Sequence, residues 1–248
     1  MAERIVLITG GAKRLGAAVT NLLIEKGCFV IIHVRRSVAE AEELLARANK
    51  KFGRVCGAVL QGDLSHQSDV ESMLEWLNSS ELIREHGLFG LIHNASNYTP
   101  IPIGELTGED MDDLYHLHMR SPLTLSNGLF EPLSRGHGSI VGIIDTSWKR
   151  HWKGLTHYTA TKAGLRQILT NLAGEYAPHV RVNSIGPGAI LAADWEEEHF
   201  QHVLGNVPMD RPGSPSDIAH AVLHFLESNH LNGIFLPVDG GWDLNMNQ

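Results

Sequence analysis

Residues 9 to 16 read Thr-Gly-Gly-Ala-Lys-Arg-Leu-Gly, and they follow the apolar run Ile-Val-Leu-Ile of residues 5 to 8. The apolar run predicts a buried strand, and the glycine-rich turn leads into a helix that begins at Leu15. A strand, turn and helix of this kind direct free backbone N–H groups at a phosphate. Gly10 is expected to allow the tight turn and the close approach of a pyrophosphate, and Gly16 to let the helix pack against the strand.

The rest of the chain repeats this alternation of apolar runs and amphipathic segments. Further strands are predicted at residues 28 to 34, 55 to 61, 88 to 94, 139 to 145, 180 to 184 and 233 to 238. Helices are predicted at residues 15 to 26, 38 to 52, 65 to 78, 110 to 133, 156 to 176 and 216 to 227. The alternation indicates an α/β fold, a Rossmann-like doubly wound parallel sheet of seven strands with helices on both faces. No linker interrupts it, so residues 1 to 248 are expected to form a single dinucleotide-binding domain.

The charge balance argues against a nucleic acid as partner. Lys and Arg total 20 and Asp and Glu total 28, which gives a formal net charge of −8, and the sequence has no basic block. A strand begins within the first residues without a signal-peptide pattern, and no uninterrupted apolar run reaches the roughly 18 residues that a membrane span needs. We therefore expect a soluble, cytoplasmic protein that binds neither nucleic acid nor a membrane.

Neither the cysteines nor the histidines are arranged as metal ligands. Cys28 and Cys56 are too few for a disulfide scaffold, and each lies at the start of a predicted strand, so buried thiols are expected. The 15 histidines include no His-x-x-x-His pair with a glutamate between. No metal site is predicted.

Tyr158 and Lys162 lie four residues apart, on one face of a predicted helix. This spacing is common by chance, so its weight depends on the motifs around it. In chain order these are Thr9-Gly10 to Gly16, Asp63-Leu64, Asn94-Ala95, Tyr158 with Lys162, Asn183 with Pro187-Gly188, and Asp239-Gly240-Gly241. Together they resemble the short-chain dehydrogenase/reductase family over essentially the whole chain.

Within that family, the chain looks most like the pteridine reductases and the bacterial dihydromonapterin (dihydrofolate) reductases. The features that carry this resemblance are Arg14 in the turn, Arg35-Arg36-Ser37 after the second strand, Asp145 in place of the usual serine thirteen residues before Tyr158, and His93-Asn94-Ala95-Ser96 followed by Tyr98. The broad family has Asn-Asn-Ala-Gly where this chain has His93 to Ser96. It also has a catalytic asparagine, part of a proton relay from lysine to water, where this chain has His118.

The resemblance implies NADP(H) as the cofactor, and the residues after the second strand support it. An acidic residue there would hold a ribose 2′-hydroxyl and repel a 2′-phosphate, whereas arginines attract the phosphate. Arg36 and Ser37 are the expected ligands, with Arg35 facing outward. Asp63 is expected beside the adenine, and it can also cap the following helix. The full set implied for the cofactor is Gly10, Lys13, Arg14, Leu15, Arg35, Arg36, Ser37, Asp63, Leu64, Asn94, Ala95, Ser96, Tyr158, Lys162, Pro187, Gly188 and Ile190.

Asp145, Tyr158 and Lys162 are the predicted catalytic residues. A free tyrosine has a pKa of about 10, and the charge of Lys162 one helical turn away is expected to lower it. The resemblance also implies that Lys162 holds the nicotinamide ribose. A serine hydroxyl can donate to a carbonyl oxygen, but an ionised carboxylate cannot. Asp145 is therefore expected to stabilise positive charge on a ring nitrogen, as a pair with Tyr158, so that the reduced bond is carbon–nitrogen.

The expected activity is the NADPH-dependent reduction of a dihydropterin or dihydrofolate to its tetrahydro form. The implied substrate contacts are Arg14, Ser96, Tyr98, Asp145 and Tyr158. Tyr98 either stacks on the substrate or packs on the core, and Trp148 and Trp152 either shape the pocket or cover it. His33 and His93 are expected to be interior histidines, and His118 either an interior residue or an acid. Two other functions remain open: a carbonyl or alcohol oxidoreductase, and a non-catalytic NADP-binding sensor. The resemblance also implies a homodimer or homotetramer.

Overall fold

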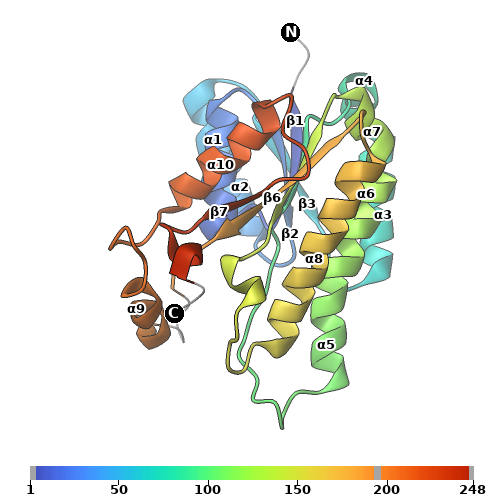
Figure 1. Cartoon of the computed structure of the whole chain (residues 1–248). Helices are drawn as coiled ribbons and strands as arrows, with labels where there is room; N and C mark the ends of the chain where they lie inside the picture. Colours follow the sequence, from blue (N-terminus) through green and yellow to red (C-terminus); the bar gives the residue numbers. More distant parts are fainter. Residues whose placement is uncertain (1–3, 193–196, 246–248) are drawn as a thin grey trace.

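Parallel strands form a single sheet through the centre of the molecule (Figure 1). The computed structural model describes residues 4 to 192 and 197 to 245. Within that part of the chain, the sheet has seven strands in the order β3-β2-β1-β4-β5-β6-β7. Their bounds are β1 Ile5–Thr9, β2 Phe29–Val34, β3 Gly57–Gln61, β4 Gly90–His93, β5 Ser139–Ile143, β6 Arg181–Pro187 and β7 Phe235–Val238. The predicted seven-stranded parallel sheet is therefore confirmed.

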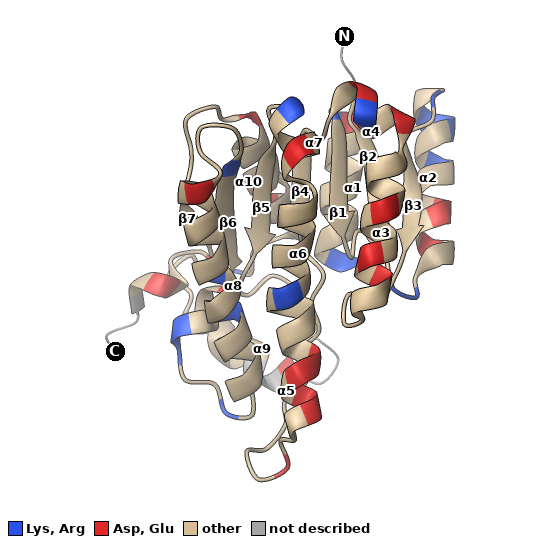
Figure 2. Cartoon of the chain, turned by 90° about the vertical axis from the view of Figure 1, so that its right-hand side faces the viewer, with Lys and Arg blue, Asp and Glu red and all other residues tan. Residues whose placement is uncertain are grey.

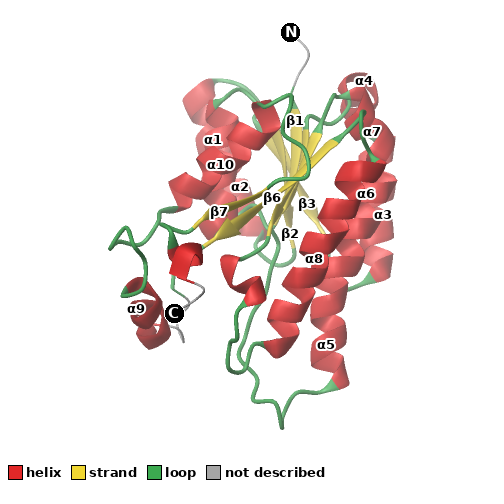
Figure 3. Cartoon of the chain, viewed as in Figure 1, coloured by secondary structure: helices red, strands yellow, loops and turns green. Residues whose placement is uncertain are grey.

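Helices cover both faces of the sheet (Figure 3). One face is covered by α1 Arg14–Glu25, α2 Val38–Phe52 and α10 Pro215–Glu227, and the other by α3 Gln67–Ser79, α6 Ser121–Gly128 and α8 Thr156–Glu175. Alternate residues of β1 point to opposite faces: Val6 and Ile8 pack into the first core, and Ile5 and Leu7 into the second. Burial on both faces explains why the strands read as continuous apolar runs.

The strand order reverses at β1, which pairs with β2 on one side and β4 on the other. At such a reversal the connecting segments leave the carboxyl ends of the two strands in opposite directions, and a crevice opens between them. The turn after β1 and the segment after β4 both lie at this edge. The fold thus places the glycine-rich turn beside the loops that carry the other motifs.

The helix predicted at residues 110 to 133 is confirmed over most of its length, because the backbone is helical without a gap from residue 108 to residue 128, but it contains a π-helical turn and is interrupted at Leu129. The structure divides this region into α5 Gly108–Tyr115, a π-helical turn η1 His116–Arg120, α6 and α7 Phe130–Arg135. Pro122 has no N–H for the carbonyl four residues before it, so an α-helix cannot continue unchanged through this point. The chain widens into the π-helical turn directly before Pro122, and His118 lies inside that turn.

Elements that have only short or irregular patterns in the sequence went unpredicted. These are α4 Glu81–His86, α9 Glu197–Leu204 and two 3₁₀ turns, η2 Thr146–Lys149 and η3 Trp242–Asn245. The predicted strand at residues 139 to 145 ends two residues early, because Asp145 caps η2 by accepting the N–H of Ser147. The remaining predicted helices and strands match to within a few residues at each end.

The other sequence expectations concern thiols, charge and membranes. Cys28 and Cys56 are free and buried, as predicted. The side shown in Figure 2 carries acidic residues along α3 and α5, and its basic residues are scattered. None of the helices in the described residues is long and apolar enough to cross a bilayer.

Candidate active site

Hydrogen bonds from Thr9 and Asn94 join the carboxyl ends of β1 and β4. The Thr9 hydroxyl accepts the backbone N–H groups of Asn94 and Ala95, both at 3.0 Å, and donates to the carbonyl of Ile92 at 3.2 Å. The Asn94 amide donates in return to the carbonyls of Thr9 and Gly10, at 2.9 and 3.0 Å. These hydrogen bonds hold two of the predicted cofactor segments together, and the side-chain groups that make them already have partners within the protein.

The glycines of the turn leave no room for side chains. Gly10 has φ of +64°, and a Cβ on Gly16 would lie 2.1 Å from the Gly10 carbonyl oxygen. No side chain caps the N-terminus of α1, so its first N–H groups face the crevice without a side-chain partner. This cradle fits a bound pyrophosphate, because backbone can approach it closely and the helix N-terminus favours an anion.

His33 supports the turn from behind. Its Nδ1 accepts the N–H of Gly10 at 3.3 Å, and its Nε2 is 3.0 Å from the carbonyl of Gly62. A carbonyl only accepts, so Nε2 carries the proton and the ring is neutral. Burial lowers the pKa of His33. The prediction that His33 is an interior histidine is confirmed.

The arginine and lysine of the turn bond to protein groups. The Arg14 guanidinium donates to the carbonyls of Leu191 and Ala192, at 2.9 and 3.2 Å. Lys13 pairs with Glu40 of α2 at 2.6 Å on the exposed surface. Arg14 thereby connects the turn to the loop after β6, and direct contact of either residue with a ligand stays a prediction.

The predicted 2′-phosphate residues surround the end of β2. Arg35 and Arg36 are exposed, and Ser37 immediately precedes α2. Arg35 lies 3.8 Å from a carboxylate oxygen of Asp63. The other Asp63 oxygen accepts the N–H of Ser65 at 2.9 Å, so Asp63 caps this turn and not helix α3.

Three predicted cofactor residues near these segments are buried or partly buried. Leu64 packs into the core under α3, and Pro187 is buried at the end of β6. Gly188 lies so close to Asp239 that a Cβ on it would be 2.5 Å from the Asp239 Cβ. The motifs after β6 and β7 therefore meet at the carboxyl edge of the sheet.

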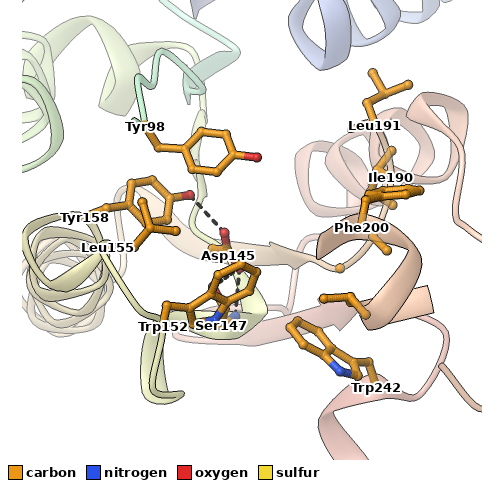
Figure 4. A pocket seen from close by; sticks show the side chains of 13 residues that line it. Tyr98, Asp145, Ser147, Trp152, Leu155, Tyr158, Ile190, Leu191, Phe200 and Trp242 are labelled. Atoms are coloured by element: carbon orange, nitrogen blue, oxygen red, sulfur yellow. Dashed lines mark hydrogen bonds between the residues drawn. The ribbon is translucent and has the colours of Figure 1, made fainter. Parts of the chain in front are cut away.

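Tyr158 and Asp145 are brought together by helix α8 and turn η2 (Figure 4). The Tyr158 hydroxyl donates to one Asp145 carboxylate oxygen at 2.9 Å. The other oxygen accepts the backbone N–H and the hydroxyl of Ser147, at 2.7 and 2.6 Å. The carboxylate is fixed by three donors at the mouth of a pocket, in reach of a bound ligand.

Lys162 lies one turn further along α8 and is buried. Its ammonium donates to the carbonyl of Ile143 at 3.2 Å and lies 5.6 Å from the centroid of the Tyr158 ring. Burial lowers the pKa of Lys162 to about 8, against the opposing effect of the Asp145 charge. The predicted trio thus forms one cluster.

A pocket opens beside this cluster. Its walls are Tyr98, Asp145, Ser147, Trp152, Leu155, Tyr158, Gly188, Ala189, Ile190, Leu191, Phe200, Val203 and Trp242 (Figure 4). The Tyr98 and Tyr158 rings are 5.2 Å apart at an angle of 37°. The polar groups of the pocket gather around Asp145, and the rest of the wall is apolar. A flat polar ring with an apolar or aromatic substituent suits this division.

The two tryptophans after Asp145 have different positions. Trp152 lines the pocket and contacts Trp242 edge-on, with ring centroids 6.2 Å apart. Trp148 packs against Phe235, at 6.3 Å, and does not line the pocket. Of the two residues, only Trp152 shapes the site.

Sequence reasoning missed the pocket wall formed by Phe200, Val203 and Trp242. These residues come from α9 and η3, which carry no family motif that the sequence analysis used. Asp239 places Trp242, because its carboxylate accepts the N–H groups of Gly241 and Asp243, at 3.0 and 2.8 Å, and closes the turn after β7. The Asp239-Gly240-Gly241 motif is the sequence signal that could have located Trp242, because it marks the turn that returns the chain to the pocket.

The segment after β5 holds this C-terminal turn in place. Arg150 lies 4.2 Å above the Trp242 ring and donates to the Trp242 carbonyl at 2.6 Å. Lys149 pairs with the Asp243 carboxylate at 2.9 Å. Two regions almost a hundred residues apart in the sequence thus form one wall.

His118 and His93 are buried, and neither has the character of an acid. His118 lies between the hydroxyls of Ser96 and Thr161, at 3.0 and 2.9 Å. Burial lowers its pKa well below 6.5, with smaller effects from the charges of Lys162 and His157. His93 bonds to Ser126 at 2.9 Å, and burial lowers its pKa to about 3. Both histidines are interior residues, and the acid role considered for His118 is not supported.

The chain is similar to known proteins over almost its full length. The dihydromonapterin reductase of Enterobacter sp. (strain 638) is 29% identical over 248 residues, which cover 98% of this chain and 98% of that protein. Carbonyl reductase family member 4 of Danio rerio is 29% identical over 251 residues, with coverage of 98% and 100%. Among solved structures, FolM alternative dihydrofolate reductase 1 from Brucella canis, complexed with NADP, has a TM-score of 0.86 and 30% identity, and covers 100% of this chain and 97% of that one.

These matches confirm the resemblance found in the sequence and the prediction of an oxidoreductase. A family model described as short chain dehydrogenase matches residues 4–203. That range contains the glycine-rich turn, Asp145, Tyr158 and Lys162 in their family order. The chain belongs to the short-chain dehydrogenase family.

Proposed function

We propose that this protein is an NADPH-dependent pterin reductase that converts a dihydropterin or dihydrofolate to the tetrahydro form. The observation that carries the proposal is the hydrogen bond from Tyr158 to the Asp145 carboxylate at the polar end of the pocket. Full-length similarity to dihydromonapterin reductases, and to a dihydrofolate reductase structure that contains NADP, supports it.

The crevice at the edge of the sheet fits NADP(H). The cradle of Gly10 and Gly16 would receive the pyrophosphate, and the exposed side chains of Arg35 and Arg36 would receive the 2′-phosphate. When bound, the cofactor supplies the hydride. Because Lys13 is paired with Glu40, its charge is partly neutralised. Arg35 and Arg36 therefore provide the main attraction for the 2′-phosphate.

The Asp145–Tyr158 pair suits the reduction of a carbon–nitrogen double bond. An ionised Asp145 stabilises positive charge on a ring nitrogen near it, and the Tyr158 hydroxyl, 2.9 Å away, holds a proton that can pass to that nitrogen directly or through a shared water. Ser147 fixes the carboxylate with two further donors, so its position does not depend on Tyr158. Lys162 keeps a positive charge behind the tyrosine.

A carbonyl or alcohol oxidoreductase is the second candidate, and the similarity to a carbonyl reductase is the observation that favours it. Against it, Asp145 stands at the position where a donor would be needed for a carbonyl oxygen that gains negative charge. An NADP-binding sensor is the third candidate, and the intact Tyr158 and Lys162 cluster argues against it.

One substrate panel separates the three candidates. NADPH consumption is measured with dihydrobiopterin, dihydromonapterin, dihydrofolate and simple ketones, in the natural protein and in Asp145→Ser. We expect turnover of at least one pterin, and a loss of several orders of magnitude in the variant. Turnover of ketones alone would identify a carbonyl reductase, and no turnover with intact NADPH binding would identify a sensor. Assembly as a homodimer or homotetramer and a cytoplasmic location stay predictions.

A further inference from the structure

Three side chains connect the segment after β4 to helix α8 through the π-helical turn. His118 is 1% exposed. Its Nε2 lies 3.0 Å from the hydroxyl of Ser96, and its Nδ1 lies 2.9 Å from the hydroxyl of Thr161. The Thr161 hydroxyl in turn donates to the backbone carbonyl of Tyr158 at 2.9 Å.

The proton positions along this chain follow from the acceptor at its end. A carbonyl can only accept, so the single Thr161 proton points at Tyr158 and away from His118. Nδ1 of His118 must then donate to the Thr161 oxygen. Because burial lowers the pKa of His118 well below 6.5, the ring is neutral and carries only one N–H. Nε2 is therefore an acceptor, and the Ser96 hydroxyl must donate to it.

We propose that His118 is a positioning residue: it is held as the Nδ1–H tautomer, and it turns the Ser96 hydroxyl so that the Ser96 oxygen faces the crevice as a hydrogen-bond acceptor only. Ser96 is exposed at the end of β4, directly after the Asn94 and Ala95 groups that join β1. A serine that rotates freely could donate or accept. Here the ligand group that meets it must be a donor.

That donor is an N–H or O–H group of the ligand, and we take an amide or amino N–H as the case to test. Two groups of the proposed reaction belong to this class, the carboxamide of the nicotinamide and the ring amino group of a pterin. The identity of the donor rests on the proposed function, because that function is what brings these ligands beside Ser96. The tautomer itself does not depend on which ligand binds.

The tautomer is measured directly by nitrogen NMR of the ¹⁵N-histidine-labelled natural protein. The His118 signals are assigned from their loss in His118→Phe or, where that variant does not fold, from their shift in Ser96→Ala. We expect a protonated Nδ1 and an unprotonated Nε2. A protonated Nε2, or a doubly protonated ring at neutral pH, would overturn the proposal.

A double-mutant cycle tests whether His118 acts through Ser96. Dissociation constants for NADPH and KM values for a dihydropterin are compared in Ser96→Ala, His118→Phe and the double variant. We expect each single change to weaken the same ligand by several fold and the double change to add nothing more. A rise in the NADPH dissociation constant places the donor on the cofactor, and a rise in KM alone places it on the substrate.

His93→Phe is the matched control, because it also removes a buried neutral imidazole with a serine partner. It should lower stability and leave NADPH affinity unchanged. Additive losses in the cycle, or no loss in Ser96→Ala, would reject the positioning role. The NMR and NADPH measurements need no turnover, so they test the role of His118 even in an enzyme that reduces ketones and not pterins, an outcome that would refute the proposed function alone.

Discussion

The turn after β1 is built from neighbours in the sequence, whereas the pocket takes its walls from residue 98, residues 145 to 158, residues 188 to 191, residues 200 and 203, and residue 242. In the turn, backbone lies against backbone, and one added carbon at Gly16 would sit 2.1 Å from an oxygen. In the pocket, side chains pack on side chains, and the proposed chemistry rests on a single hydrogen bond between Tyr158 and Asp145. We therefore expect that substitutions which add volume will impair the turn, and that substitutions which remove particular atoms will impair the pocket.

The largest expected effect is on chemistry in the pocket. Tyr158→Phe removes the hydroxyl but keeps the ring that packs against Tyr98. Turnover should fall by about 10²- to 10⁴-fold with NADPH affinity nearly unchanged, because a positioned acid–base group contributes on that order. Lys162→Ala should reduce both turnover and NADPH affinity. Tyr115→Phe, which removes an exposed hydroxyl outside the pocket, is the control. Normal turnover in Tyr158→Phe would contradict its role.

The turn should respond most to added volume. Gly16→Ala forces the backbone of the turn to move, and strain of this kind costs about 1 to 3 kcal/mol, or roughly 10- to 100-fold in NADPH affinity. Calorimetric titration with NADPH measures the change. Gly104→Ala is the matched control, because nothing lies within 4 Å of a Cβ at that position. Equal affinity in both variants would show that the turn is looser than its geometry indicates.

The end of β2 should respond to charge. Arg36→Ala is expected to weaken NADPH about tenfold, since a charge-assisted hydrogen bond contributes about 1.5 kcal/mol, and to leave NADH affinity unchanged. Arg47→Ala makes the same change of charge in α2, where Arg47 pairs with Glu43 on the surface. An equal loss of affinity for NADPH and NADH in Arg36→Ala would show that Arg36 does not bind the 2′-phosphate.

The effect that bears least on the turn and the pocket concerns the stability of the protein in acid, through the buried His93. His93 stays neutral in the folded protein down to a pKa of about 3, against an ordinary value of 6.5. The unfolded chain takes up the proton first, so this contribution is fully present above pH 6.5 and is lost as the pH falls, by about 1.4 kcal/mol per pH unit.

Urea unfolding of the natural protein and of His93→Gln between neutral pH and about pH 5 measures this contribution. The variant should be less stable near neutral pH, and its stability should fall less steeply in acid. His66→Gln, at an exposed position, should not change the slope. Parallel slopes for all three proteins would show that His93 is not a buried neutral group.

The sequence alone determined the sheet and the turn. Apolar runs such as residues 5 to 8, alternating with amphipathic helices, specify a parallel sheet because each strand is buried on both faces. Gly10 and Gly16 identified the cradle, because Gly10 has a positive φ and Gly16 leaves no space for a Cβ beside the Gly10 carbonyl. The order of Asp145, Tyr158 and Lys162 identified the family and the cluster, since α8 fixes the last two on one face.

Only the tertiary structure decided how these parts meet. The sequence predicted Arg14 as a contact of the cofactor and the substrate, but only the structure shows that it also bonds to two carbonyls of the loop after β6. Phe200 carries no signal in the sequence, and Trp242 carries only that of the turn before it, because a pocket wall requires only an apolar side chain at the right place. His118 was ambiguous for a similar reason: its tautomer depends on Ser96, Thr161 and the carbonyl of Tyr158, which come together only when the helix containing Pro122 widens into a π-helical turn. Local sequence propensity specifies the helices and strands. The tautomer of a buried histidine is instead determined by hydrogen-bond partners that only folding brings together.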